Sequence, residues 1–268
     1  MSDAEIPRVL AIANQKGGVG KTTTAINLAA ALTAVGERVL LIDGDPQGNA
    51  STGLGVLPHM RAKTLYDVLM DDLPLLRAAV ETEVPALHLV PAEADLSGVE
   101  LELGQTARRA FRLRDALAGV RGGRVYDHVL IDCPPSLNLL TVNAMTAADA
   151  VLVPLQCEFF ALEGLTQLLR TVEQVRTSLN ATLEIQGVVL TMYDRRNSLS
   201  ALVAKDVRQH LGDRVYDTVI PRNVRISEAP SFGKPAIIYD LQCAGSQAYL
   251  KLAREVIARE RRREPAAS

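Results

Sequence analysis

The feature that most constrains this chain is a glycine-rich segment lying between two apolar stretches near its beginning. Residues 13–27 read Ala-Asn-Gln-Lys-Gly-Gly-Val-Gly-Lys-Thr-Thr-Thr-Ala-Ile-Asn. The apolar run 9–13 before the glycines is typical of a buried strand, and the pattern of 22–35 predicts a helix that ends at Gly36. A second apolar run follows at 39–42. This order of strand, loop, helix and strand predicts a β-α-β unit with parallel strands.

The same alternation of apolar runs and helical patterns continues to the end of the chain. Further strands are predicted at 87–90, 129–131, 151–153, 185–190 and 219–220. Further helices are predicted at 99–119, 137–147, 162–179, 200–211 and 245–262. The alternation predicts an α/β fold with a doubly wound, mostly parallel sheet flanked by helices, and it places the motifs that follow the strands at one edge. Residues 52–85, with several Gly, Pro and polar residues, are predicted to be an irregular insertion.

Length and composition are consistent with one large domain, and we expect residues 1–268 to form it. The chain is 48% hydrophobic but 4% aromatic, which suits a core of aliphatic strands and helices. Of the 29 Lys/Arg and 31 Asp/Glu, 14 and 9 lie in residues 194–264, which leaves 15 and 22 in residues 1–193. The basic C-terminal third, about 190–262, can meet polyanions, although an ordinary solvated surface explains the same charges.

Several other classes of protein are disfavoured. Cys133, Cys157 and Cys243 are widely spaced and form no C-x-x-C pair, so neither a disulfide framework nor a zinc site is predicted. The first ten residues contain acids and no apolar core of a signal peptide. No apolar run reaches the roughly 18 residues that a membrane-spanning helix needs. We therefore expect a cytoplasmic protein with reduced thiols.

The glycine-rich segment has the features of a phosphate-binding loop. A strand that runs through residues 17–20 into a helix directs backbone N–H groups and the helix N-terminus at one point, which makes an anion site. Lys21 can reach the β- and γ-phosphates, and the Thr22 hydroxyl can hold Mg²⁺. A glycine cluster alone would also suit a turn that only packs strand against helix. Gly20-Lys21-Thr22 at the junction of strand and helix favours nucleotide binding.

Two aspartates at predicted strand ends supply further chemistry. Asp132 follows the run 129–131 and can hold Mg²⁺ directly or through water. Asp45 follows the second strand, where a carboxylate could orient an attacking water, with Asp43 as a less favoured competitor. Either aspartate alone would more often cap a turn. Their occurrence together with a phosphate loop favours the chemical roles.

The motifs resemble those of a known family. Residues 16–22, Lys-Gly-Gly-Val-Gly-Lys-Thr, resemble the deviant Walker A motif of the ParA/MinD class of P-loop ATPases. Residues 43–49, Asp-Gly-Asp-Pro-Gln-Gly-Asn, resemble the second acidic motif of that class, and residues 132–136, Asp-Cys-Pro-Pro-Ser, resemble its Walker B motif. Segments that resemble chromosomal, Soj-like ParA ATPases lie at 190–197, 220–230 and 231–235. The resemblance extends over residues 8–260.

The resemblance implies a slow, partner-stimulated ATP hydrolase that uses ATP and Mg²⁺ and closes into an ATP-sandwich homodimer. Lys16 would be the signature lysine that reaches the nucleotide of the partner subunit, and Asp45 would position the attacking water, so that Lys16, Lys21 and Asp45 carry the catalysis. The residues expected to bind the phosphates are Lys16, Gly17, Gly18, Val19, Gly20, Lys21, Thr22 and Thr23. The residues that match the region around the adenine base are Met192, Pro221, Arg222 and Asn223.

The family also binds DNA non-specifically and works with a ParB-like protein, which implies a nucleoid-associated protein that segregates chromosome origins. Arg196 and Arg225 align with arginines linked to DNA binding in Soj-like proteins. Other basic residues that could add phosphate contacts are Arg195, Lys205, Arg208, Arg222, Lys234, Lys251 and Arg254. Each of these is also consistent with a solvated charge. No recognition helix or aromatic stacking pattern is present, so sequence-specific readout is not expected.

Three alternatives remain to be weighed. A MinD-like membrane switch needs bulky apolar residues near the end of a C-terminal helix, but Val256 and Ile257 are followed by Arg259 and by arginines at 261–263. The cysteines do not match an electron-transfer relative that binds a metal cluster. A ParA-like positioner of protein cargo would share every ATPase residue and stays open. Gly44 stands where this family more often has a side chain, and it could loosen that strand end.

Overall fold

The computed structural model describes residues 6–104 and 106–263, and it contains one eight-stranded sheet. The strands are β1 (Arg8–Ile12), β2 (Val39–Asp43), β3 (Val80–Glu81), β4 (Leu87–Val90), β5 (His128–Asp132), β6 (Ala150–Gln156), β7 (Glu184–Tyr193) and β8 (Val215–Pro221). Their order across the sheet is β3-β4-β2-β5-β1-β6-β7-β8. The short β3 pairs antiparallel with β4, and the other neighbouring strands pair parallel. The predicted α/β class and mostly parallel sheet are confirmed.

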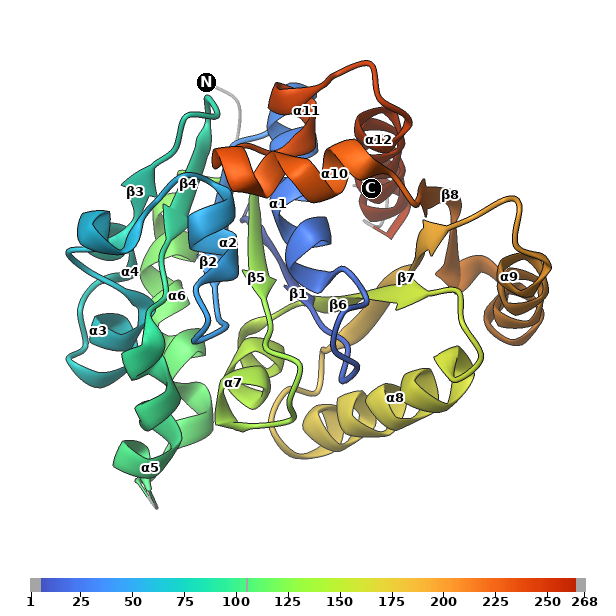
Figure 1. Ribbon diagram of the computed structural model, residues 1–268. Coiled ribbons are helices and arrows are strands. Elements are labelled where there is room, and N and C mark those ends of the chain that lie inside the picture. Colours follow the sequence, from blue (N-terminus) through green and yellow to red (C-terminus); the bar gives the residue numbers. More distant parts are fainter. Residues whose placement is uncertain (1–5, 105, 264–268) are drawn as a thin grey trace, which may run out of the picture.

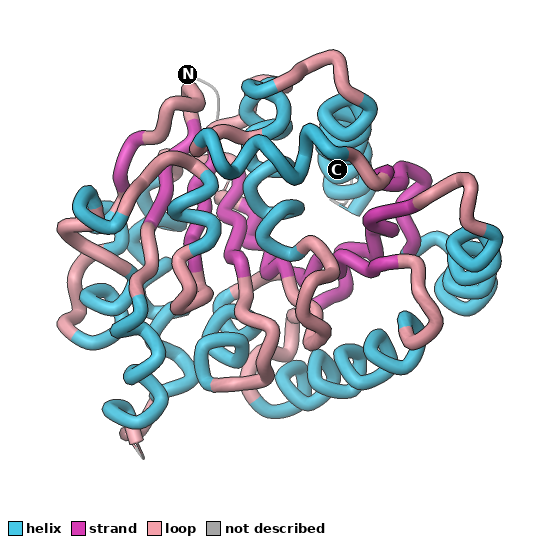
Figure 2. Tube along the Cα trace, viewed as in Figure 1, coloured by secondary structure: helices cyan, strands magenta, loops and turns pink. Residues whose placement is uncertain are grey.

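Helices cover both faces of this sheet (Figure 1), which Figure 2 shows as a band of strands enclosed by helices. The helices are α1 (Lys21–Ala34), α2 (Asn49–Gly53), α3 (Leu65–Met70), α4 (Leu75–Ala78), α5 (Val99–Leu103), α6 (Arg112–Gly123), α7 (Leu139–Ala147), α8 (Ala161–Ser178), α9 (Ser198–Leu211), α10 (Val224–Glu228), α11 (Ala236–Tyr239) and α12 (Ala244–Arg263). Alternate strand residues point to opposite faces. Val9 and Ala11 of β1 therefore join the core beneath α6–α9, whereas Leu10 and Ile12 join the core beneath α1 and α12.

Three sequence predictions need correction. The helix predicted at 99–119 is two helices, because α5 ends at Leu103 before Gly104, whose φ is 44°, and α6 begins only at Arg112. The predicted insertion 52–85 contains the end of α2 together with α3, α4 and β3, each too short to show a clear period. The strand predicted to end before Pro154 continues to Gln156, because β7 pairs with it along its whole length.

The strand register brings the motifs together. Ile12, the last residue of β1, pairs with Asp132 at the end of β5, and Asp132 also pairs with Asp43 at the end of β2. The glycine-rich loop, the acidic segment after β2 and the segment after β5 therefore leave the sheet side by side. The expected convergence of the motifs on one edge of the sheet is confirmed.

Candidate functional site

The glycine-rich loop has the backbone conformation of an anion cradle. Gly18 and Gly20 have φ values of 76° and 86°, which residues with side chains rarely adopt. Gly20 is the N-cap residue of α1 and has no side chain that could cap the helix. The backbone N–H groups in the first turn of α1 are therefore available to an anion. The carbonyl oxygen of Val19 accepts a hydrogen bond from the Thr191 hydroxyl at 2.8 Å, which fixes the loop to β7.

Lys21 is the buried cation of this loop. It is 7% exposed, and its ammonium donates to the carbonyl oxygen of Lys16 at 3.1 Å. Burial lowers the pKa of Lys21, whereas the nearby Asp132, Cys133 and Asp45 favour its charged form. A buried amine held at the glycine-rich loop is suited to phosphate oxygens, because these would replace the water that burial has removed.

Asp132 supplies a buried carboxylate beside that lysine. Its side chain is completely buried, and neither oxygen has a hydrogen-bond partner of normal geometry among the residues that the structure describes. Burial and the neighbouring Asp43 raise the pKa of Asp132 well above its usual value, while Thr22 and Lys21 act in the opposite direction. A buried carboxylate of this kind calls for a cation, and Mg²⁺ held by Thr22 and Asp132 would fit. Within 6–104 and 106–262, no three acidic, His or Cys side chains gather as a metal site, so the other magnesium ligands would be phosphate oxygens and water.

The two aspartates after β2 have different surroundings. Asp43 accepts hydrogen bonds from the Ser51 backbone N–H at 2.8 Å and from the Ser51 hydroxyl at 2.7 Å. Burial raises the pKa of Asp43 to about 6 despite these bonds. Asp45, two residues further along the chain, is 8% exposed, and its Oδ1 accepts a hydrogen bond from the Gln47 N–H at 3.0 Å. Asp43 therefore holds the start of α2, whereas Oδ2 of Asp45 is not used by the hydrogen bond to Gln47.

Gly44, whose departure from the family pattern could loosen this strand end, lies in close contact with the end of β5. Its N–H donates to the carbonyl oxygen of Asp132 at 2.9 Å, which ties the end of β2 to the end of β5. A Cβ at position 44 would lie 2.7 Å from the same oxygen. Glycine therefore permits a close approach of the two acidic strand ends.

A pocket of about 120 Å³ adjoins the phosphate loop and contains all four residues predicted near the adenine base. Its lining is Gly20, Thr23, Thr191, Met192, Ile220, Pro221, Arg222, Asn223, Ile226, Ser227 and Tyr249. Met192 has a φ of 50°, so its backbone is held in the left-handed region at the pocket wall. Ile226 and Tyr249 were missed in the sequence, because an apolar residue on a short helix and a tyrosine on α12 resemble ordinary core residues.

Lys16 forms an ion pair within the chain that the sequence did not reveal. Its ammonium forms an ion pair with Glu158, in the loop between β6 and α8, and its side chain is 38% exposed. Phe159 and Phe160 follow Glu158 and are both exposed, with their rings edge to face. The lysine therefore lies at the surface of the site, whereas Lys21 lies inside it.

The predicted DNA-binding residues fall into separate places. Arg195 and Arg196 line a groove of about 900 Å³ between the ends of β7 and β8 and α12. Arg222 and Lys251 line the same groove, as do the acids Asp194 and Asp217. Arg196 is 88% exposed and donates two side-chain hydrogen bonds to Asp194, which hold the pKa of Asp194 at about 2. The groove carries an excess of positive charge.

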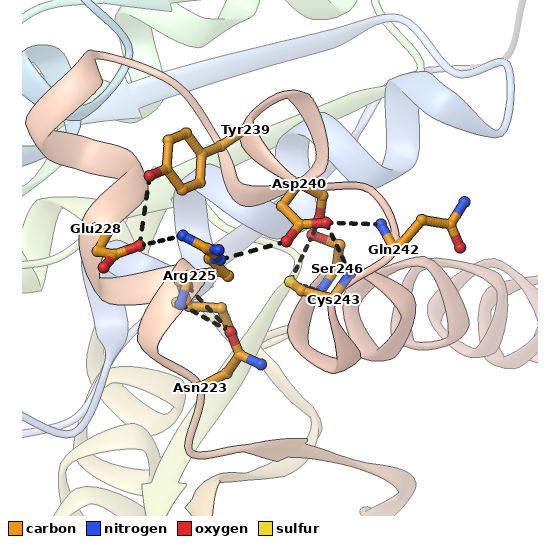
Figure 3. A network of polar contacts seen from close by, with 9 residues as sticks. Asn223, Arg225, Glu228, Tyr239, Asp240, Gln242, Cys243 and Ser246 are labelled. Carbon is orange, nitrogen blue, oxygen red and sulfur yellow. Dashed lines mark hydrogen bonds and ion pairs between the residues drawn. The ribbon is translucent and has the colours of Figure 1, made fainter.

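Arg225, Lys205 and Arg208 do not line this groove. Figure 3 shows Arg225 between two acids, with Nη1 at 3.0 Å from Glu228 and Nε at 3.5 Å from Asp240. The guanidinium of Arg208 donates to the Tyr216 carbonyl oxygen at 3.0 Å and lines a second groove, beside the start of β8 and the second half of α12. Lys205 is exposed on α9.

Comparison with known proteins gives consistent similarities. A family model described as AAA domain matches residues 7–185. The chain is 76% identical to the chromosome partitioning protein ParA of Caulobacter vibrioides over 261 residues, which are 97% of this chain and 98% of that protein. It is 52% identical to the sporulation initiation inhibitor protein Soj of Bacillus subtilis over 251 residues, 94% of this chain and 98% of Soj.

Among solved structures, the fold is similar to that of cobyrinic acid a,c-diamide synthase from Mycobacterium smegmatis with bound ADP and magnesium. The TM-score is 0.83 at 40% sequence identity, and the match covers 95% of this chain and 96% of the other. In the described part of the chain, no helix is long and apolar enough to cross a membrane.

Proposed function

This chain belongs to the ParA/Soj family of chromosome-partitioning ATPases, and from that premise we propose that it is a slow, DNA-binding switch driven by Mg-ATP. The chain would act as one ATPase domain that dimerises around ATP and binds nucleoid DNA without sequence preference. A ParB-like partner would then stimulate hydrolysis and release it, so that the cycle moves chromosome origins. No membrane partner enters this cycle.

The observation that carries the ATPase proposal is the buried carboxylate of Asp132 beside Lys21 and the glycine-rich loop. Thr22 and Asp132 would hold Mg²⁺, which when bound neutralises charge on the phosphates. Lys21 would hold the β- and γ-phosphates, and Asp45, whose second oxygen is not used by the Gln47 turn, would orient the attacking water. The adenine base would occupy the adjoining pocket.

The position of Lys16 supports the proposed dimer. Its ammonium lies at the surface and is neutralised by Glu158 instead of by the loop that it flanks. A lysine in this place can exchange Glu158 for the phosphates of a nucleotide bound to a second subunit, and it would stabilise charge that develops during hydrolysis. Phe159 and Phe160 are exposed beside it, which is favourable for a surface that a second subunit covers.

The groove containing Arg195, Arg196, Arg222 and Lys251 supports the proposed DNA binding. The four cations of the groove are exposed. Among the residues that line the groove, Tyr193 is the one aromatic side chain that could stack on a base. Contacts of this kind bind phosphates and carry little sequence information. Affinity should therefore fall steeply as salt is raised.

Two variants test the proposed division of labour. Asp45→Ala should bind ATP and DNA but release almost no phosphate in a single-turnover assay, because the water loses its orienting carboxylate. Lys16→Ala should bind nucleotide normally but fail to form the Mg-ATP dimer in sedimentation velocity experiments. Ordinary turnover by Asp45→Ala would remove Asp45 from the mechanism. A dimer of wild-type affinity in Lys16→Ala would remove the role of Lys16 across the interface.

A further inference from the structure

Arg61 is a buried cation whose side chain connects three separate backbone segments. It follows a short 3₁₀ turn, Pro58–Met60, and is 9% exposed. Its Nε donates to the carbonyl oxygen of Val56 at 3.0 Å, and its Nη1 donates to that of Ala92, just after β4, at 2.8 Å. Its Nη2 donates to the Thr52 hydroxyl at 2.8 Å and to the Gly48 carbonyl oxygen at 3.3 Å.

All four acceptors of this guanidinium are uncharged. In the described ranges, 6–104 and 106–262, Arg61 has no ion pair with a carboxylate. A buried charge without a counter-ion is unfavourable for folding unless its hydrogen bonds are satisfied, and an apolar side chain of similar size would often be tolerated better. An arginine differs from such a side chain in its rigid fork of donors, which fixes the relative positions of its acceptors. Arg61 therefore fixes Gly48 and Thr52, on one side, relative to Val56 and Ala92 on the other.

Gly48 is the last residue of the turn that carries Asp45. The Gly48 N–H donates to the Asp45 carbonyl oxygen at 2.9 Å, and the Gln47 N–H donates to the Asp45 side chain at 3.0 Å. Gly48 has a φ of 62°, and a Cβ there would lie 2.4 Å from Nη1 of Arg61. The turn thus admits the guanidinium only because its last residue is glycine. One end of the Asp45 turn is fixed by β2 and the other by Arg61.

A second anchor holds the same segment independently of Arg61. The Ser51 hydroxyl donates to Asp43 of β2 at 2.7 Å, and the Ala92 N–H donates to the Ser51 oxygen at 3.2 Å. Helix α2 therefore stays attached to the sheet when the arginine is replaced. The Thr52 N–H also donates to the Gly48 carbonyl oxygen, at 3.0 Å. What the replacement removes is the tie from the Gly48 carbonyl and the Thr52 hydroxyl to the Val56 and Ala92 carbonyl oxygens, and with it a restraint on the turn that precedes α2.

We propose that Arg61 is a positioning residue for ATP hydrolysis, which acts by fixing the turn that presents Asp45 to the attacking water. The proposal rests on the role proposed above for Asp45. Arg61 does not line the base pocket. Its replacement should therefore lower kcat while leaving nucleotide affinity unchanged. A displacement of about 1 Å in a catalytic group is sufficient to lower the rate by up to about 100-fold.

The test compares Arg61→Met and Arg61→Lys with a matched control, Arg112→Met. Arg112 also donates to a backbone carbonyl, that of Leu69 at 2.7 Å, and it pairs with Asp72 at 2.8 Å, so that it holds α3 and not the Asp45 turn. Urea denaturation measures the loss of stability in each variant, and single-turnover phosphate release measures hydrolysis. We expect Arg61→Met to lose roughly 10- to 100-fold in kcat with KM for ATP within about twofold of wild type. Arg61→Lys should recover little of this loss, because an ammonium cannot span the four acceptors.

Combination with Asp45→Asn distinguishes positioning from general destabilisation. If Arg61 acts through Asp45, then Arg61→Met should cause no further loss of hydrolysis in the Asp45→Asn background. A further loss of the same factor in that background, or a wild-type kcat in Arg61→Met, would overturn the proposal. A kcat that falls equally in Arg112→Met at equal stability would also overturn it.

A milder variant keeps the test valid if Arg61→Met does not fold. Thr52→Ala removes one of the four hydrogen bonds from an exposed position, and it should lower kcat by a smaller factor in the same direction. An unchanged kcat in Thr52→Ala, together with normal hydrolysis by folded Arg61→Lys, would contradict the proposal. Ordinary turnover by Asp45→Asn would instead refute the role of Asp45, so the two failures are distinguishable.

Discussion

His128 should make the stability of the protein depend on pH within the physiological range. It is the first residue of β5, so it lies at the N-terminal ends of the strands, opposite the nucleotide site, and it is 5% exposed. Its Nε2 lies 2.8 Å from Glu260 of α12, and its Nδ1 lies 3.5 Å from Glu37. Arg8 lies 4.0 Å from Glu260 on the same side. Burial acts to lower the pKa of His128, but the two carboxylates outweigh it and raise the pKa to about 9.

The sign and size of the effect follow from linkage. Because the folded-state pKa is raised above the value of about 6.5 in an unfolded chain, the contribution is fully present below pH 6.5 and is lost as the pH rises through about 9. At about 1.4 kcal/mol per pKa unit, the whole contribution is about 3 kcal/mol. Between pH 6.5 and pH 8 the free energy of unfolding should fall by roughly half of that contribution.

Urea denaturation without nucleotide, at several pH values from 6.5 to 8, measures this fall. The pKa of Asp43 is about 6, so most of its titration lies below the window. The matched variant is His128→Gln, which keeps a polar side chain but cannot titrate. It should be less stable at pH 6.5 and should lose most of the pH dependence. An equal slope in the wild type and in His128→Gln would refute the assignment, as would a wild-type stability that rises with pH in this window.

Two further predictions concern acids that neutralise functional cations. Glu228→Gln should tighten DNA binding in the presence of Mg-ATP, because the Glu228 carboxylate no longer competes with DNA phosphates for Arg225. The control Glu173→Gln, which removes a similar ion pair with Arg176 on α8, should leave DNA binding unchanged. Electrophoretic mobility shifts at constant salt compare the two variants. Weaker binding by Glu228→Gln would mean that the acid orients Arg225 instead. Glu158→Gln should lower the protein concentration at which Mg-ATP produces the dimer, because the variant frees Lys16 from its ion pair. Sedimentation velocity measures that concentration, and a weaker dimer in Glu158→Gln would contradict the prediction.

The parts of the site that consist of contiguous residues could be predicted from the sequence. In the run 13–27 and at the aspartates after two strands, the geometry depends on a strand end, a glycine with positive φ and a helix start, and each of these is determined by neighbouring residues. The partners of the functional cations are not local. Glu158 lies 142 positions from Lys16, and Asp240 meets Arg225 only because α12 begins beside α10. No pattern of residue types in the sequence indicates such a pair.

Arg61 illustrates a second limit. It lies in the segment 52–85, whose elements are too short for a periodic pattern, and its acceptors are mostly backbone carbonyl oxygens that every residue possesses. The sequence therefore shows an arginine in a polar stretch, which is typical of the surface. Gly48 was the available signal, since a glycine three residues after Asp45, near the end of the acidic motif, indicates a close approach or a positive φ.

In the proposed cycle, the bound nucleotide controls DNA binding by the basic surface. This control is tested most directly by measuring the affinity for a DNA fragment of arbitrary sequence with Mg-ATP, with Mg-ADP and without nucleotide, across a salt series. We expect tight binding only with Mg-ATP, with an affinity that falls steeply and linearly with salt on logarithmic axes and is the same for unrelated sequences. Equal affinity in all three nucleotide states, or binding that is insensitive to salt, would contradict the claim.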